Sequence, residues 1–166
     1  MKISIDPKIL ESFPDAKIGW LRAGVANAGG AAHVRALKAG LEARLNDIGI
    51  SADTMMMHPD VRRWREVYSA MGVKPSKYRS SLEALLRRIF KGDLWEVSPV
   101  VDCYDCVSAL SLLPMGAHDM EKLRGGLTLR YAENGEKFYP LGAGDSVIEC
   151  AERHVVYADG EKVCCW

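Results

Sequence analysis

The sequence predicts an α+β fold, with helices in the first two thirds of the chain and a mainly antiparallel sheet in the last third. Apolar residues recur at helical spacing up to about residue 113, and beyond Gly125 they fall in short runs separated by turn formers. Helices and strands that are segregated along a chain are typical of α+β folds rather than doubly wound ones. The 166 residues, 48% hydrophobic and 27% charged, suffice for one domain, expected at 1–166.

The first fifty residues contain two strand candidates and two helix candidates. They are strands at 2–5 and 17–26 and helices at 7–13 and 31–48, with a turn at 27–30 and a glycine helix stop at Gly49. Residues 24–30 contain the GxxxxG spacing of a phosphate-binding loop. However, Gly30 and Ala31 occupy the positions that would need Lys and Ser or Thr, so we interpret this stretch as a strand-to-helix turn.

Two amphipathic helices are predicted in the middle of the chain. The first begins at His58 and ends at Gly72, with its apolar stripe at Val61, Trp64, Val67, Tyr68 and Met71. Ser80 and Glu83 have the spacing of a capping box, so the second should begin there. Its last turn carries three bases that suit the helix dipole, namely Arg87, Arg88 and Lys91.

A third helix is expected at 99–113, and short antiparallel strands after it. Asp102 could cap that helix if the helix begins there, and Pro114 and Gly116 follow its end. The strand candidates are 127–131, 137–139, 147–148, 155–157 and 163–166. Asn134-Gly135 predicts a hairpin turn between the first two.

Composition excludes several classes of protein and indicates one charged surface. No apolar run approaches the length of a membrane helix, and the first residues lack the apolar core of an export signal, so we expect a cytoplasmic protein. The net charge is zero, yet residues 60–92 hold nine Arg and Lys against three acids. This excess predicts a positive face, which nucleic acid or an acidic partner would suit.

The cysteines do not have the pattern of a metal or redox site. Cys103 and Cys106 form a CxxC, but it falls inside a predicted helix, and the adjacent Cys164 and Cys165 fall in a predicted strand. Zinc ligands usually come from turns, and a redox CxxC needs a thioredoxin-like context. We therefore expect reduced thiols, with no metal and no cofactor.

The polar residues between Val100 and Asp119 allow two interpretations. They are a helix cap, a solvated helix face and a turn, or they line a binding pocket from a helix and the loop after it. The candidates are Asp102, Tyr104, Asp105, Ser108, His118 and Asp119.

The same stretch carries a resemblance to a known family. Residues 100–119 resemble, without a gap, a segment of the B3/B4 domain in the β subunit of phenylalanyl-tRNA synthetase, its tRNA-editing module. Residues 71–88 resemble free-standing proteins built from this domain alone, and the likeness extends over 58–166. It implies a B3/B4-like fold. Members of that family continue beyond the position of Trp166, so a strand or C-terminal helix of the family is expected to be absent.

The resemblance implies hydrolysis of a wrong amino acid from tRNA, which in the synthetase is tyrosine on the tRNA for phenylalanine. The family's Thr-Asn pair corresponds to Tyr104 and Asp105, and its histidine corresponds to Gly116, with His118 two residues further on. The editing pocket for tyrosine is therefore altered here.

These observations assign candidate roles to a set of residues, with tRNA or aminoacyl-tRNA as the expected partner. Asp105 or His118 would orient the attacking water, and the amino-acid pocket would comprise Tyr104, Ser108, Gly116 and Asp119. The phosphates of tRNA would be held by Arg62, Arg63, Arg65, Lys74, Lys77 and Arg79. The alternative is a non-catalytic module that binds tRNA, a nucleotide or an amino-acid-like ligand; a third interpretation is an interaction domain that acts through a partner protein.

Overall fold

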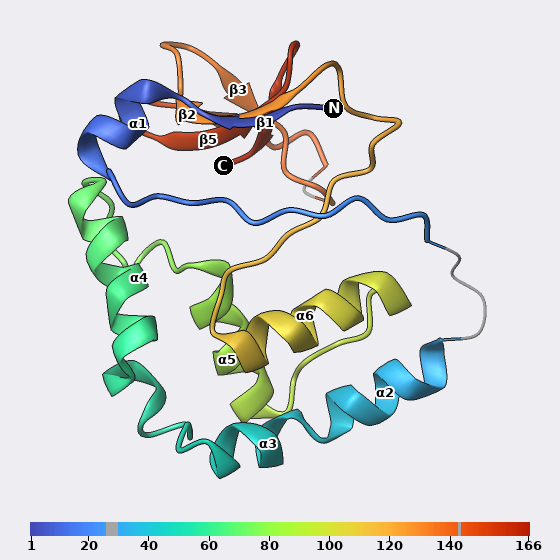
Figure 1. Cartoon of the computed structure of the whole chain (residues 1–166). Coiled ribbons are helices and arrows are strands. Elements are labelled where there is room, and N and C mark those ends of the chain that lie inside the picture. The colour runs from blue at the N-terminus through green and yellow to red at the C-terminus, as the bar shows by residue number, and fades with distance from the viewer. Residues whose placement is uncertain (26–29, 143) are drawn as a thin grey trace. The chain divides into compact units, whose positions relative to one another are not determined.

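The computed structural model describes residues 1–25, 30–142 and 144–166, which form two compact units (Figure 1). The sheet unit comprises residues 1–22 and 118–166, and the helical unit comprises residues 23–117. The predicted α+β class is confirmed, because the helices concentrate in the first two thirds of the chain and the sheet is mainly antiparallel.

The sheet unit is built around a four-stranded sheet with the order β1-β2-β5-β6. Its strands are β1 (Ile3–Ile5), β2 (Leu127–Tyr131), β5 (Val155–Ala158) and β6 (Val163–Cys165). β1 pairs parallel with β2, and the other neighbours are antiparallel. A second pair consists of β3 (Lys137–Phe138) and β4 (Ile148–Glu149), and α1 (Pro7–Ser12) contacts β2.

The predicted hairpin at Asn134-Gly135 is only half right. A turn is present there, with Gly135 at φ 80, a conformation that favours glycine. However, β2 pairs with β1 and β5 rather than with β3, because β5 takes the strand edge that a hairpin partner would need. Arg130 and Glu136 form a two-pronged ion pair of 2.6 and 2.8 Å beside this turn.

The sheet unit has a small core of its own. It contains Ala132, Cys150, Val156, Ala158 and Val163, with Phe138 and Trp166 packed against it. Asp159 and Gly160 lie in the connection between β5 and β6. At Gly160 a Cβ would lie 2.9 Å from the carbonyl oxygen of Arg124, so a side chain does not fit there.

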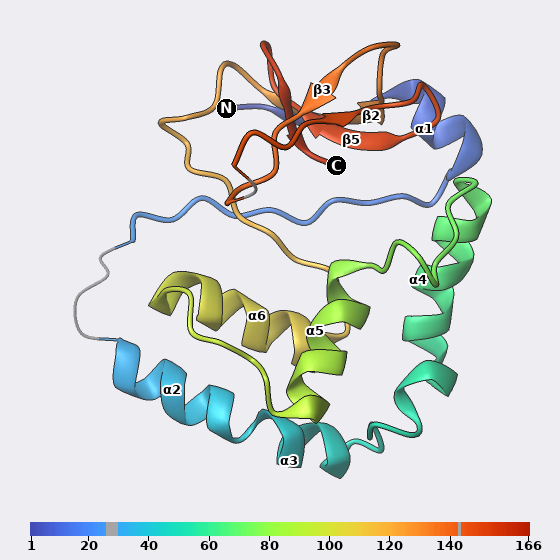
Figure 2. The same ribbon diagram turned by 180° about the vertical axis from the view of Figure 1, so that it is seen from behind.

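The helical unit contains the remaining helices (Figure 2). They are α2 (Ala31–Ala39), α3 (Leu41–Asp47), the short 3-10 helix η1 (Met55–Met57), α4 (Pro59–Ala70), α5 (Ser81–Lys91) and α6 (Pro99–Ser111). α6 packs against α2, α3 and α5. The core between them contains Leu41, Leu45, Ile50, Met55, Val61, Leu82, Leu85, Leu86, Ile89, Cys106, Ala109 and Leu112.

Two predictions for the first fifty residues need correction. The strand expected at 17–26 is wrong, since residues 17–25 have no regular structure and Leu21 is 83% exposed. Glycines at 19 and 24 weaken a strand, and this segment connects the two units instead of joining a sheet. The helix expected at 31–48 is two helices separated at Gly40. The turn expected at 27–30 lies largely outside the described residues.

The helix starts follow local capping chemistry. Ser80 caps α5 as predicted, because its hydroxyl accepts the Glu83 N–H. α6 is capped by Ser98, which accepts the Val101 N–H, so the N-cap role expected of Asp102 is wrong. Pro99 occupies the first turn of α6, where its missing N–H costs nothing.

Candidate functional site

Asp102, near the start of α6, forms an ion pair with Lys38 on α2. Its carboxylate is buried and accepts hydrogen bonds from Lys38 Nζ at 3.0 Å and from the backbone N–H of Val97 at 3.2 Å. Lys38 Nζ also donates to the carbonyl oxygen of Trp95. A buried carboxylate with an ion-pair partner and a backbone donor is satisfied internally. Asp102 therefore positions α6 and the preceding loop.

Tyr104 and Asp105 follow on α6, and both are half-buried. Burial, and then the charge of Asp102, raises the pKa of the Asp105 carboxyl against the opposing charges of Lys38 and Arg88. Burial also raises the pKa of the Tyr104 hydroxyl, with smaller contributions from Asp105 and Asp102. Asp105 is therefore more basic than an exposed aspartate, and Tyr104 keeps its proton and can donate a hydrogen bond.

The end of α6 uses the hydroxyl of Ser108 for its own structure. Ser108 is buried, and its Oγ donates to the carbonyl oxygen of Leu113 at 2.6 Å. Leu112 closes the helix in the left-handed conformation, with φ 55. Gly116 is exposed, and a Cβ built on it meets nothing within 4 Å. The position that corresponds to the family's histidine therefore has room for a side chain.

His118 and Asp119 begin the return of the chain into the sheet unit. His118 is exposed, and its ring centroid lies 6.4 Å from that of Tyr157. The part of the His118 ring that is buried lowers its pKa, and the negative charge of Asp159 acts in the opposite direction. Asp119 Oδ1 accepts the Glu121 N–H at 2.9 Å in a turn. Because Asp105 belongs to the helical unit and His118 to the sheet unit, their joint action stays a prediction.

The cysteines are all reduced, and they are divided between the two units. Burial, helped by Cys103, raises the pKa of the Cys106 thiol to about 11, and burial raises that of Cys165. In the described part of the chain, no three His, Cys, Asp or Glu side chains are grouped closely enough to hold a metal ion.

Part of the predicted tRNA-binding set is exposed on α4 and the loop after it. Arg62, Arg63, Lys74 and Lys77 are all exposed. The carbonyl oxygen of Lys74 accepts the N–H groups of Lys77 and Tyr78, which makes this loop a turn. Lys77 Nζ lies 5.1 Å from the centroid of the Tyr78 ring, a cation–π contact.

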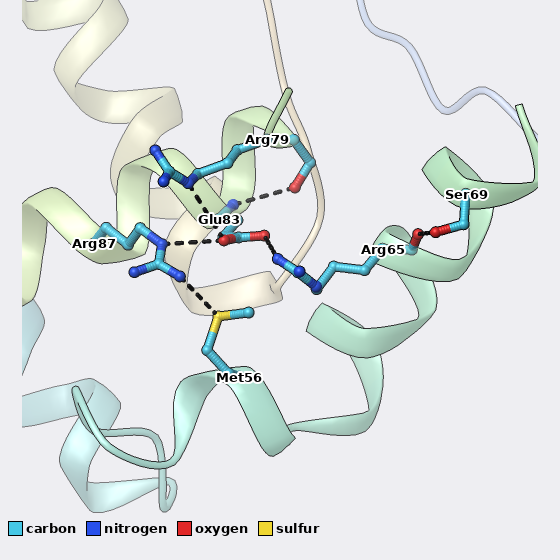
Figure 3. A network of polar contacts seen from close by, with 7 residues as sticks. Met56, Arg65, Ser69, Arg79, Glu83 and Arg87 are labelled. Atoms are coloured by element: carbon cyan, nitrogen blue, oxygen red, sulfur yellow. Dashed lines mark hydrogen bonds and ion pairs between the residues drawn. The ribbon is translucent and has the colours of Figure 1, made fainter. Parts of the chain in front are cut away.

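The other two predicted residues, Arg65 and Arg79, converge with Arg87 on Glu83 (Figure 3). Arg65 Nη1 donates to Glu83 Oε2 at 2.8 Å. Arg87 Nε donates to Oε1 at 3.0 Å, and Arg79 Nε lies 3.7 Å from the same oxygen. Glu83, the partner of Ser80 in the predicted capping box, therefore has its carboxylate turned toward the three arginines. We call Glu83 with these three residues the arginine cluster.

An open hollow of about 660 Å³ lies beside the arginine cluster. It is lined by Met56, Met57, Arg62, Arg65, Glu66, Ser69 and Pro75. Arg65 belongs both to the hollow and to the cluster, and Met56 Sδ accepts a hydrogen bond from Arg87 Nη2 at 3.3 Å (Figure 3). Cationic and apolar side chains thus lie together in the lining of this hollow.

Sequence reasoning missed the roles of Glu83, Arg87 and Lys38. Glu83 and Arg87 are spaced four apart on α5, and Arg79 lies four residues before Glu83, just ahead of the helix, so these contacts were detectable from the sequence. By contrast, Arg65 is 18 residues from Glu83 and Lys38 is 64 from Asp102. No local pattern predicts such pairs, because they depend on how α4 meets α5 and how α2 meets α6.

Comparison with known proteins gives a family match over most of the chain. The model of the B3/4 domain matches residues 63–166, a range that includes α6, most of α4 and residues of both units. The chain belongs to the B3/4 domain family. This confirms the resemblance drawn from residues 58–166.

Two curated relatives of this B3/4 domain protein are both phenylalanine–tRNA ligase beta subunits. The one from Chromobacterium violaceum is 33% identical over 76 residues, which is 46% of this chain and 9% of that protein. The one from Fusobacterium nucleatum subsp. nucleatum is 33% identical over 95 residues, 57% of this chain and 12% of that protein. The chain thus spans only a small part of the length of these relatives. No solved structure matches it significantly. Within the described residues, no helix is long and apolar enough to cross a membrane.

Proposed function

We propose that this B3/4 domain protein binds tRNA and hydrolyses the ester bond of wrongly charged aminoacyl-tRNA. The observation that carries the proposal is the basic surface of α4, the following loop and the arginine cluster, nearly all within the range that matches the family. The two curated relatives act on tRNA by name. Exposed guanidinium and ammonium groups on one surface are the usual contacts for backbone phosphates.

The hydrolysis would take place around α6 and the loop that follows it. A water oxygen attacks the ester carbonyl carbon, its proton passes to a base, and the tRNA 3′ oxygen leaves with a proton. Asp105 is the proposed base, since its raised pKa suits it to accept the water's proton better than an exposed aspartate would. Tyr104, with its retained proton, can donate a hydrogen bond to the substrate, and His118 can assist in orienting the water.

A second candidate is a non-catalytic module that binds tRNA, a nucleotide or an amino-acid-like ligand. It is favoured by the use of the Ser108 hydroxyl within α6 and by the glycine at position 116. Under this alternative the same basic surface binds tRNA, but Asp105 and His118 catalyse nothing. The two candidates share the tRNA contact and differ in the release of amino acid.

The first test measures tRNA binding as a function of salt. Affinity should fall with salt by roughly 0.7–0.9 log units per log unit of salt for each phosphate contact. Replacing Arg62, Arg63 and Lys77 together by glutamine should flatten this slope and weaken all tRNAs alike, because phosphates carry no sequence information.

Arg88→Gln is the matched control for that triple variant. Arg88 is exposed in the last turn of α5, and its guanidinium lies 4.0 Å from the centroid of the Trp95 ring. Replacing Arg88 should therefore leave the salt dependence of tRNA binding unchanged. A wild-type protein without salt-dependent tRNA binding at low ionic strength would end the proposal and its alternative.

The second test separates catalysis from binding. The protein is incubated with a panel of mischarged tRNAs, including tyrosine on the tRNA for phenylalanine, and the released amino acid is measured. Release that is lost in Asp105→Asn while tRNA affinity is kept would support hydrolysis. Binding without release for every tRNA of the panel would leave the non-catalytic alternative.

A further inference from the structure

The arginine cluster has an unusual balance of charge and exposure. The Glu83 side chain is 1% exposed, whereas the side chains of Arg65, Arg79 and Arg87 are 31%, 48% and 39% exposed. One buried carboxylate thus holds three guanidinium groups whose outer edges remain accessible. Three positive charges and one negative charge leave a formal surplus of two positive charges at this point of the surface.

The guanidinium of Arg87 donates one of its hydrogen bonds to a weak acceptor, the sulfur of Met56. Arg87 Nε is bound by Glu83, and its Nη2 donates to Met56 Sδ at 3.3 Å. A thioether sulfur is a weak acceptor, whereas hydrogen bonds from a guanidinium to an anionic oxygen are roughly twice as strong as neutral ones. An anionic oxygen that displaced the sulfur would therefore gain a stronger bond without any change in the Glu83 contact.

The hollow would allow an anion to reach the arginine cluster from solvent. Met56 and Arg65 line the hollow and also take part in the contacts of the cluster, so the hollow reaches the Arg65 guanidinium and the Met56 sulfur that accepts from Arg87. Arg62 adds a further positive side chain to its lining, and Glu66 adds one carboxylate. An arginine fork already fixed by a carboxylate on one edge can bind a phosphate with its other edge at a low cost in side-chain entropy.

We propose that Arg65, Arg79 and Arg87 form a seat for one backbone phosphate of RNA, and that Glu83 is the positioning residue that holds them. This inference rests on the proposed function, since it assumes that RNA approaches the basic surface. Glu83 itself does not touch the phosphate. It keeps three mutually repelling guanidinium groups together around its two oxygens.

Removing the charge of Glu83 should change RNA affinity in opposite directions for a phosphate seat and for a purely structural ion-pair network. Glu83→Gln removes a negative charge, so general electrostatics predicts tighter RNA binding. The phosphate seat predicts weaker binding, because without the carboxylate the guanidinium groups separate and lose their common orientation. Glu66→Gln makes the same chemical change at an exposed residue of the hollow and is the matched control.

The experiment measures tRNA affinity by fluorescence anisotropy at one low salt concentration, with circular dichroism to verify folding. Glu83→Gln should weaken binding by roughly tenfold, and Glu66→Gln should bind as tightly as the wild type or more tightly. Replacing chloride by inorganic phosphate at constant ionic strength should reduce tRNA binding more in the wild type than in Glu83→Gln. Binding by a folded Glu83→Gln variant that equals or exceeds that of the wild type overturns the inference and leaves the proposed function intact.

A second pair of variants applies if Glu83→Gln does not fold. Arg87→Lys keeps the charge but cannot contact Glu83 and a phosphate with one planar group, so it should weaken binding roughly fivefold. Arg44→Lys, an exposed arginine of α3 outside both the cluster and the proposed phosphate contacts, should bind like the wild type. Equal affinity in the two variants overturns the inference. Absence of tRNA binding by the wild-type protein overturns both the inference and the proposed function.

Discussion

At the scale of single residues, Asp159 organises the turn between β5 and β6. Its carboxylate accepts the backbone N–H groups of Arg124, Glu161 and Lys162 at 2.8–2.9 Å. Burial alone would raise the pKa of this carboxyl, but the three hydrogen bonds and the charge of Lys162 outweigh it and lower the pKa to about 2. The ionised form of Asp159 therefore stabilises the folded sheet unit.

Replacing Asp159 by asparagine should reveal this contribution through its pH dependence. The folded pKa lies below the unfolded value of about 3.9, so the stabilisation is present above that value and is lost as the pH falls toward 2. At pH 7 the variant should be less stable by about 1 kcal/mol, a modest figure because solvent screens this exposed turn. Urea unfolding at pH 7, 4 and 2 measures the difference, which should shrink with acid. A constant difference would show that the ionised carboxylate is not the cause.

A second residue-scale prediction concerns Gly116, where a new Cβ meets nothing within 4 Å. The family resemblance puts a histidine at this position, so Gly116→His should be tolerated and should raise the rate of aminoacyl-tRNA hydrolysis, by at least about tenfold if the imidazole acts on the attacking water. Gly116→Ala controls for the loss of glycine itself. A folded histidine variant that is no faster than the alanine variant would argue against catalysis in this loop.

At the scale of elements, the ion pair between Lys38 and Asp102 fixes α2 against α6. The two side chains are 10% and 7% exposed, and Lys38 also reaches the carbonyl oxygen of Trp95. An ion pair this deeply buried adds little net stability over apolar packing, but breaking it leaves one charge unpaired.

Lys38→Met should therefore destabilise the protein by about 3–5 kcal/mol, because the buried Asp102 carboxylate would lose its ion-pair partner. The double variant Lys38→Met with Asp102→Leu should be more stable than the single variant. Chemical denaturation of the wild type, both single variants and the double variant gives the coupling energy. Additive losses would mean that the two groups do not depend on each other.

The elements that the sequence predicted correctly are those with local causes. α4 and α5 follow from their apolar stripes, and the Ser80 cap fixes the start of α5. The strand expected at 17–26 failed because an apolar run shows only that burial is favourable, not that a neighbouring strand is available. The partner of β2 could not be predicted either, since pairing with β5 across more than twenty residues competes with the local turn at Asn134-Gly135.

The candidate site was predictable to a similar extent. Arg62, Arg63, Lys74 and Lys77 are exposed, as expected of side chains that would meet phosphates, whereas Ser108 is used inside α6. The contacts of Arg65 with Glu83 and of Lys38 with Asp102 join segments that are distant in the sequence. The roles of Asp105 and His118 remain predictions, because a family position and a pKa direction do not by themselves establish a catalytic contact.

At the scale of the whole molecule, we expect a protein that does not depend on metal, because no three His, Cys, Asp or Glu side chains among the described residues are grouped closely enough to hold a metal ion. Cys103 and Cys106 lie in the helical unit, and Cys164 and Cys165 lie in the sheet unit. Purified protein should contain well under one zinc per chain, and its melting temperature should not change in chelator. A structural zinc contributes about 10–16 kcal/mol to folding, so its removal would be obvious in the melting curve. Stoichiometric, tightly held zinc would refute the expectation.

The parallel pairing of β1 with β2 has a consequence for the protein as it leaves the ribosome. Ser4 and Thr128, whose hydroxyl groups lie 3.0 Å apart across these strands, are separated by 124 residues of sequence. At a translation rate of about 5–20 residues per second, β2 is synthesised roughly 6–25 s after β1. All of the helical unit is synthesised during that interval, so its core can form while the backbone of β1 is still unpaired. The nascent chain therefore carries an open strand edge until the sheet closes, and this is the period in which a chaperone would protect it.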